Sequence, residues 1–274
     1  MDDRPIGMFD SGFGGLTVAR ALIDLLPDED LVYFGDTGRY PYGSRPLHDV
    51  REFAQQITEL LIAEHDVKMV VVACNTAAAA ALDLLHFEHD VPIVGVIDPG
   101  VRAAARATRN GSVGVIGTVG AIGSGAYQRA FTATRAPVAL TCAACPGFVE
   151  FVERGETDSE QVHVLAERLL SPVVAAGVDT LLLGCTHYPF LARTIGDVMG
   201  RHVVLVSSAD ETAFEIRSIL AETGLGRRTE GKGCHRFASS GDVGWFKELG
   251  SKLLGLDMGD VERLAWDEQE GRWR

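Results

Sequence analysis

Two short segments of the chain resemble each other, and each carries one cysteine near its end. The first is Met69-Val-Val-Val-Ala-Cys74-Asn75-Thr76, and the second is Thr180-Leu-Leu-Leu-Gly-Cys185-Thr186-His187. Each has an apolar run, a small residue, the cysteine and polar side chains, which is typical of a buried strand ending at a loop. Open α/β sheets bind ligands at such strand ends. One thiol from each of two equivalent segments suits a reaction that needs a base on both faces of one carbon.

The two thiols have the chemistry of an acid and a base. An unperturbed thiol has a pKa of about 8.5, and a helix N-terminus favours its thiolate. Cys74 precedes a predicted helix, and Cys185 precedes one predicted to start around Pro189. A carbon acid between a thiolate and a thiol can lose a proton to one and gain a proton from the other, which inverts the carbon. The sequence therefore predicts that both cysteines can become bases near neutral pH.

Other polar residues at predicted strand ends fit the same site. Asp10 and His187 are expected to set the protonation of a cysteine or to hold an amino group. Neutral donors are expected to bind a carboxylate without a metal or a cofactor, and they are Ser11, Asn75, Thr76, Thr186 and the Gly14-Gly15 backbone. The alternatives are that Asp10 is a helix N-cap, worth about 1 kcal/mol, and that His187 is a hydrogen-bonded core histidine.

Alternating strands and helices must position these residues. Strands are predicted at 6–9, 31–34, 67–73 and 91–97, and helices at 16–26, 47–65 and 76–85. This alternation implies βαβ units and a largely parallel sheet.

The pattern then restarts. Residues 113–118 parallel residues 6–11, the Cys185 segment parallels the Cys74 segment, and residues 203–208 parallel residues 93–98, at offsets of 107, 111 and 110. Parallel strands can look alike, but three matches at nearly one offset favour an internal duplication. We expect an α/β fold of two similar domains with mainly parallel sheets flanked by helices, related by internal pseudo-symmetry, with the active site in the cleft between them. The predicted domains are 1–98 plus 208–274, and 99–207.

Composition excludes several other classes of protein. The chain has 274 residues, a net charge of −13 and a pI of about 5.0, which argues against nucleic acid as the main ligand. No stretch approaches the roughly 20 apolar residues of a membrane span, and residues 1–5 show no signal-peptide pattern. Five cysteines, an odd number, indicate free thiols in a reducing compartment. A cytoplasmic location is therefore expected.

Four ordered motifs resemble glutamate racemase, of the aspartate/glutamate racemase family. They are Phe9-Asp-Ser-Gly-Phe-Gly-Gly-Leu16, Gly35-Asp-Thr-Gly-Arg-Tyr-Pro-Tyr-Gly43, Ala73-Cys-Asn-Thr76 and Leu183-Gly-Cys-Thr-His-Tyr-Pro189. The resemblance runs from residue 6 to about residue 215. It implies a cofactor-independent enzyme that makes D-glutamate for peptidoglycan, often as a homodimer, with two cysteines as opposed acid and base between two α/β domains.

Carried onto this chain, the resemblance assigns roles to particular residues. Cys74 and Cys185 would act on opposite faces of glutamate, assisted by Asp10 and His187. Asp10 and His187 are also expected to contact the substrate, together with Ser11, Tyr42, Gly43, Asn75, Thr76, Thr118 and Thr186. No metal ligand is expected. Gly38 stands where the family commonly has alanine, which is expected to loosen the loop.

Several alternatives remain open at this point. An aspartate racemase of the same superfamily is the nearest, followed by a thiol-dependent hydrolase or redox protein and by a protein that binds a DNA enzyme. Cys142 and Cys145 have the spacing of a redox or zinc pair but are interpreted as structural thiols. Glu150 and Glu153 are interpreted as the solvated face of a helix, with Glu150 possible near the cleft.

Overall fold

The computed structural model describes residues 1–255 and 258–274 of the chain. Within them the strands form two parallel sheets and one short antiparallel hairpin. The larger sheet has the order β10-β9-β2-β1-β3-β4, and its strands are β1 (Ile6–Asp10), β2 (Leu31–Gly35), β3 (Met69–Val72), β4 (Ile93–Gly95), β9 (His235–Ser239) and β10 (Val261–Arg263). The smaller sheet has the order β6-β5-β7-β8, and its strands are β5 (Ser112–Gly117), β6 (Ala139–Ala144), β7 (Thr180–Gly184) and β8 (Val204–Ser207).

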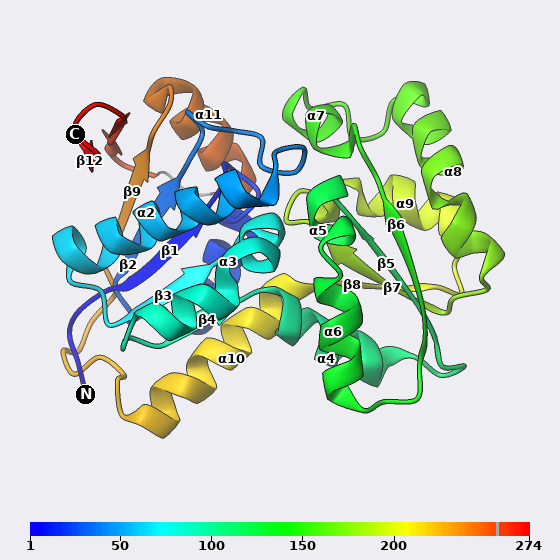
Figure 1. Cartoon of the computed structure of the whole chain (residues 1–274), viewed down its shortest axis with the longest axis horizontal. Helices are drawn as coiled ribbons and strands as arrows, with labels where there is room; N and C mark the ends of the chain where they lie inside the picture. The colour runs from blue at the N-terminus through cyan, green and yellow to red at the C-terminus, as the bar shows by residue number, and fades with distance from the viewer. Residues whose placement is uncertain (256–257) are drawn as a thin grey trace.

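Helices connect and cover these strands, and the two sheets lie side by side as two lobes (Figure 1). The helices of the first lobe are α1 (Leu16–Leu25), α2 (Leu47–His65), α3 (Asn75–Glu88) and α11 (Val243–Leu254). Those of the second are α5 (Val119–Gly123), α6 (Ala126–Thr134), α7 (Phe148–Glu153), α8 (Glu160–Ala175) and α9 (Ala192–Met199), with a 3₁₀ helix at Tyr188–Leu191. α4 (Ile97–Ala107) and α10 (Ser208–Thr223) pack on each other where the lobes meet. The hairpin consists of β11 (Trp266–Asp267) and β12 (Arg272–Trp273).

Strand order and register relate the two lobes. In each sheet the first strand in the chain lies between the second and the third, and the fourth lies outside the third. Phe9 pairs with Val72 as Ile116 pairs with Leu183, which reproduces the predicted offsets of 107 and 111 residues. The third predicted offset is wrong by two residues, because Gly95 pairs with Val72 as Ser207 pairs with Leu183, an offset of 112 (95 to 207). The pseudo-symmetry thus extends to the pairing of individual strands.

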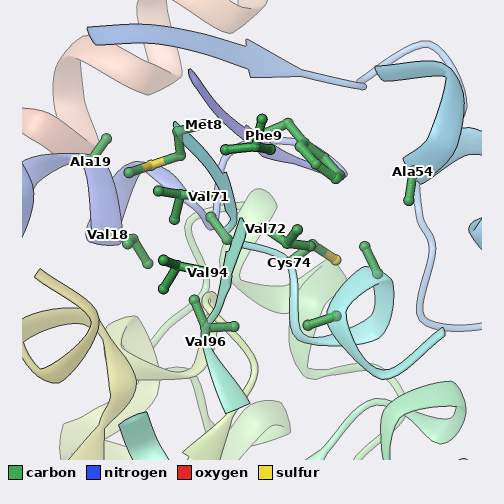
Figure 2. Close-up of a cluster of buried hydrophobic side chains, with 14 of the residues drawn as sticks. Met8, Phe9, Val18, Ala19, Ala54, Val71, Val72, Cys74, Val94 and Val96 are labelled. Atoms are coloured by element: carbon green, nitrogen blue, oxygen red, sulfur yellow. The ribbon is translucent and has the colours of Figure 1, made fainter. Parts of the chain in front are cut away.

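The core lies between the sheets and their helices. The strands β1, β2, β3 and β7 are buried along their whole length, as expected for parallel strands covered on both faces. Figure 2 shows Met8, Val71 and Val94 in this core, with the sulfur of Cys74 pointing away from Val94. The core therefore extends along β3 up to Cys74, whose sulfur lies at its edge beside the cavity.

Two predicted elements differ from the structure. The strand predicted at 91–97 covers only Ile93–Gly95, because Ile97 already begins α4 and Pro99 lies in the first turn of that helix. The helix predicted near Pro189 is the 3₁₀ helix, and the following α-helix begins only at Ala192. In the described residues, none of the helices has both the length and the apolar character needed to cross a membrane.

The strands beyond residue 223 return to the first lobe. β9 pairs with β2, and β10 pairs with β9. This return supports the proposed discontinuous first domain of residues 1–98 plus 208–274, and the proposed second domain, 99–207, contains all strands of the smaller sheet.

Candidate active site

A cavity lies between the lobes, at the carboxyl ends of strands from both sheets. Both cysteines singled out by the sequence line it, and Figure 1 shows that β3 and β7, which precede them, belong to different lobes. The other predicted site residues on its wall are Ser11, Tyr42, Gly43, Asn75, Thr76, Thr118, Thr186 and His187. The parallel strand order brings these residues together, because the carboxyl ends of β1, β3, β5 and β7 lie at sheet edges that face each other.

Cys74 is a buried thiol at the first turn of α3. It is the N-cap residue of that helix, is 5% exposed, and its Sγ lies 3.7 Å from Ser11 Oγ. Burial and the charge of Asp10 raise the pKa of Cys74 to about 12, although N–H and hydroxyl donors from Ala77 and Ser11 oppose this. In this structure, desolvation outweighs the helix N-terminus and favours the thiol form of Cys74, and its action as a base stays a prediction.

Asp10 lies behind the cavity wall, at the end of β1. Its side chain is fully buried, Oδ2 accepts a hydrogen bond from Gly12 N at 3.0 Å, and Oδ1 has no hydrogen-bond partner. It is absent from the residues that line the cavity. The N-cap alternative is also wrong, because Gly15 is the N-cap of α1. Asp10 acts on the site through its charge, which reaches both Cys74 and His187.

Cys185 faces a buried histidine. Its Sγ lies 3.9 Å from His187 Nδ1, and His187 Nε2 lies 3.4 Å from Glu153 Oε1. Burial lowers the pKa of His187, but its contacts with Cys185 and Glu153 and the charges of Cys185 and Asp10 outweigh burial and raise that pKa to about 10. His187 is thus an imidazolium at neutral pH, and it provides the positive charge beside Cys185 that we had expected from a helix N-terminus.

Hydroxyl and amide groups from both lobes meet on another wall of the cavity. Thr76 Oγ1 and Thr118 Oγ1 lie 2.9 Å apart. Asn75 Nδ2 donates to Tyr127 Oη at 2.9 Å, whereas the buried Asn75 Oδ1 has no hydrogen-bond partner. The first N–H groups of α3 also have no partner within the helix. Within the described part of the chain, the lining residues include no lysine or arginine, so a carboxylate here would meet neutral hydroxyl and N–H donors and the side chain of His187.

The loop after β2 closes one side of the cavity. Tyr42 is buried, and its Oη donates to Asp36 Oδ2. Burial and the charge of Asp36 raise the pKa of Tyr42 well above its usual value. Gly43 O accepts a hydrogen bond from Gly120 N at 2.9 Å, and a Cβ at Gly43 would lie 2.7 Å from Thr118 Cγ2. Glycine is therefore required here for the loop to reach the second lobe.

The structure adds residues that the sequence did not suggest. Cys145 directly follows β6, is buried and lines the cavity, and burial together with the charge of Cys185 raises its pKa to about 12. Tyr40 also lines the cavity. Glu150 is exposed and lines the cavity too, which agrees with the alternative that placed it near the cleft. Glu153 does not lie on a solvated face, because its side chain is 13% exposed and contacts His187. A predicted strand at 139–144 would have identified Cys145, but that segment lacks a clear apolar run.

The chain is similar to characterised racemases. Residues 16–214 match the family model described as Asp/Glu/Hydantoin racemase. A glutamate racemase of Acidothermus cellulolyticus is 51% identical over 266 residues, which are 96% of this chain and 100% of that protein.

Solved structures are similar over almost the whole chain. The glutamate racemase isoform RacE1 of Bacillus anthracis superposes with a TM-score of 0.90 at 40% identity, covering 94% of this chain and 96% of that one. The glutamate racemase of Francisella tularensis, solved with D-glutamate, has a TM-score of 0.90 at 32% identity, covering 97% and 98%.

Proposed function

Because the chain belongs to the Asp/Glu/hydantoin racemase family, we propose that it interconverts L- and D-glutamate by proton transfer between two cysteines, without a cofactor. The observation that carries this proposal is that Cys74 and Cys185 follow equivalent strands of the two lobes and line one cavity. An amino acid bound in that cavity would have one thiol on each side of its α-carbon.

The surroundings of the two cysteines differ, and this difference supports different roles. Burial and the charge of Asp10 raise the pKa of Cys74 and favour its thiol form. Cys185 Sγ lies 3.9 Å from His187 Nδ1, and the raised pKa of His187 places a positive charge beside this sulfur. We therefore assign Cys74 as the first acid and Cys185, acting as a thiolate, as the first base.

The reaction moves one proton in and one proton out. The Cys185 thiolate takes the α-proton, which breaks the Cα–H bond and leaves its electron pair on the substrate. The Cys74 thiol then donates its proton to the opposite face of the same carbon. The product has the inverted configuration, and the enzyme now holds a Cys74 thiolate and a Cys185 thiol. Exchange of protons between the two thiols and solvent restores the starting state for the next molecule, and the opposite enantiomer reacts directly in the reverse direction, so both directions proceed without an oxidant or a reductant.

The substrate's carboxylates would be held by neutral donors. Ser11, Thr76, Thr118 and Thr186 have hydroxyl groups on the cavity wall, and the first turn of α3 presents free N–H groups. Donors fixed by the fold stabilise charge that develops on the α-carboxylate when the proton leaves. The side-chain oxygen of Asn75, which has no protein hydrogen-bond partner, could accept a hydrogen bond from the substrate's ammonium group.

The test is racemisation by the purified chain. L-glutamate should lose its circular dichroism signal without any added cofactor, and in deuterium oxide its α-hydrogen should be replaced by deuterium. Cys74→Ser and Cys185→Ser should each reduce racemisation by at least about 10²-fold, the lower end of acid–base contributions. Racemisation at the parent rate in both variants would contradict the proposed mechanism.

The nearest alternative is an aspartate racemase. The two substrates differ by one methylene, a difference that a pocket distinguishes by about 1–3 kcal/mol. The relative that is 51% identical is a glutamate racemase, which supports glutamate. A comparison of kcat/KM for L-aspartate and L-glutamate decides between them, and a higher value for aspartate would replace the substrate in the proposal.

The biological setting follows from the proposed reaction. We propose that the D-glutamate formed supplies peptidoglycan synthesis, as the family resemblance implies. All five cysteines are free, which supports a reducing compartment such as the cytoplasm. A homodimer stays a prediction, and sedimentation of the purified chain tests it.

A further inference from the structure

The loop of residues 36–45 has two sides. Its front side lines the cavity with Tyr40, Pro41, Tyr42, Gly43 and Ser44. Its back side lies against residues that come more than 190 positions later in the chain, with the turn after β9 on one part and the hairpin strand β12 on another. The family match ends at residue 214, so these supporting residues lie outside it.

The turn after β9 binds the beginning of the loop through hydroxyl groups. Ser240 Oγ donates to Asp36 Oδ1 at 2.6 Å and accepts from Gly38 N at 2.8 Å. Thr37 Oγ1 lies 2.6 Å from Ser239 Oγ and accepts from Gly241 N at 3.1 Å. The same Asp36 carboxylate accepts the hydrogen bond of Tyr42. Asp36 therefore connects this turn directly to a residue of the cavity wall.

Gly38 permits this close approach. A Cβ at this position would lie 2.9 Å from Ser240 O and 3.0 Å from Ser240 Oγ. The expectation that Gly38 loosens the loop is therefore wrong: without a side chain, the loop packs directly on the backbone of Ser240.

Trp273 of β12 supports the middle of the loop through Arg39. The Arg39 guanidinium lies 5.0 Å from the Trp273 ring and 4.1 Å from the Phe53 ring. Arg39 Nε also pairs with Asp36 Oδ2 at 2.7 Å. Trp273 is itself fixed, because its Nε1 donates to Gln56 O at 3.1 Å and its ring packs edge-on against Phe34 at 4.9 Å. A cation held between aromatic rings and a buried carboxylate has little freedom to move.

We propose that Trp273 is a positioning residue, which acts through Arg39 and Asp36 to hold Tyr42 and Gly43 in place for substrate binding. Together with Ser239, Ser240 and Gly241 it forms a brace behind loop 36–45. The catalytic consequence rests on the proposed racemase function, whereas the ordering of the loop does not. The brace determines affinity for the amino acid, because the cysteines themselves are carried by other loops.

The experiment combines hydrogen exchange with kinetics on the full chain. In Trp273→Ala, backbone amides of residues 36–45 should exchange faster, and KM for glutamate should rise about tenfold with kcat within about twofold, the pattern of lost binding without lost chemistry. Trp273→Phe keeps an aromatic ring over Arg39 and should restore most of the loss. Gly38→Ala should push the loop away from Ser240, which belongs to the part of the brace outside the hairpin. It should also give faster exchange in the loop and a higher KM, without altering the hairpin.

Two controls separate positioning from general loss of stability. Leu220→Ala removes a buried side chain of α10 and should lower the melting temperature with KM unchanged. Arg272→Ala removes an exposed ion pair with Glu270 in the same hairpin and should leave both KM and exchange unchanged. Parent-like exchange of residues 36–45 and parent-like KM in Trp273→Ala and Gly38→Ala would overturn the proposal, as would an equal rise in KM in Leu220→Ala.

The exchange measurement also separates this proposal from the proposed function. If the parent chain does not racemise glutamate, the function has failed, but faster exchange in Trp273→Ala would still establish the brace. If the parent chain racemises glutamate and Trp273→Ala does not change exchange in loop 36–45, only the proposal of the brace has failed.

Discussion

The hydroxyl groups of Thr76 and Thr118 lie 2.9 Å apart, although Thr76 lies in the first turn of a helix of the first lobe and Thr118 caps a helix of the second. Both line the cavity. Thr118 Oγ1 also accepts a hydrogen bond from Ala121 N at 3.2 Å. The two lobes are thus joined by a polar contact within the candidate site itself, in addition to the packing of α4 and α10.

This contact predicts energetic coupling between the lobes. Thr76→Val and Thr118→Val should each destabilise the chain, and the double variant should lose less than the sum by about 0.5–1.5 kcal/mol, the usual net value of one hydrogen bond. A double-mutant cycle of urea unfolding measures this difference. Strict additivity would mean that the two hydroxyls do not interact in solution.

The charge of Asp10 predicts a change in the reactivity of Cys74. Burial and Asp10 together raise the pKa of Cys74 to about 12, so Asp10→Asn should lower it and increase the thiolate fraction. A fall of one unit gives about ten times more thiolate at pH 8. Alkylation of Cys74 by iodoacetamide, followed by peptide mass spectrometry, measures this rate. The exposed Cys234 is the internal control, and an unchanged ratio of the two rates would refute the role of Asp10.

The raised pKa of His187 predicts a pH-dependent contribution to stability. Its folded value is about 10 against an ordinary 6.5, so the folded state binds a proton that the unfolded state loses first. This stabilisation is complete below pH 6.5 and disappears as the pH rises to about 10. The difference in melting temperature between the parent and His187→Gln should therefore shrink across this range. An imidazole ¹⁵N signal that titrates near 6.5 would show that the Cys185 and Glu153 contacts do not hold the proton.

The absence of a side chain at Gly14 allows the first lobe to approach Thr186 and His187 of the second lobe closely. A Cβ at this position would lie 2.2 Å from Thr186 Oγ1 and 2.4 Å from His187 Nδ1. Gly14→Ala should displace both residues from Cys185 and reduce racemisation by about 10²-fold, the effect of a shift of about 1 Å in a catalytic site. Gly123→Ala is the matched control, because a Cβ there has no neighbour within 4 Å. Equal activity in the two variants would show that the lobes tolerate separation at this point.

Much of the arrangement could be predicted from the sequence because its signals are local. An apolar run that stops at a small residue and a polar group marks a strand end, and this was enough to find Cys74 and Cys185 and the strands that precede them. Repetition of such runs at a nearly constant offset predicted two related lobes, and the strand order of both sheets agrees.

The rest depended on contacts between residues far apart in the chain. No local pattern shows that Glu153 lies against His187, that Asp10 lies behind the cavity wall, or that Trp273 contacts Arg39. The pKa of Cys74 depends on such contacts as well: a helix N-terminus is visible in the sequence, whereas burial and the charge of Asp10, which raise this pKa, are not.

The amino-acid sequence by itself determined which residue types end the strands and that two thiols occupy equivalent positions. Only the tertiary structure decided which of these residues face one cavity, which are buried behind it, and that the pKa of Cys74 is raised. The physical reason is that strand and helix periodicity depends on neighbouring residues, whereas burial and charge at a point depend on every segment that the fold brings there.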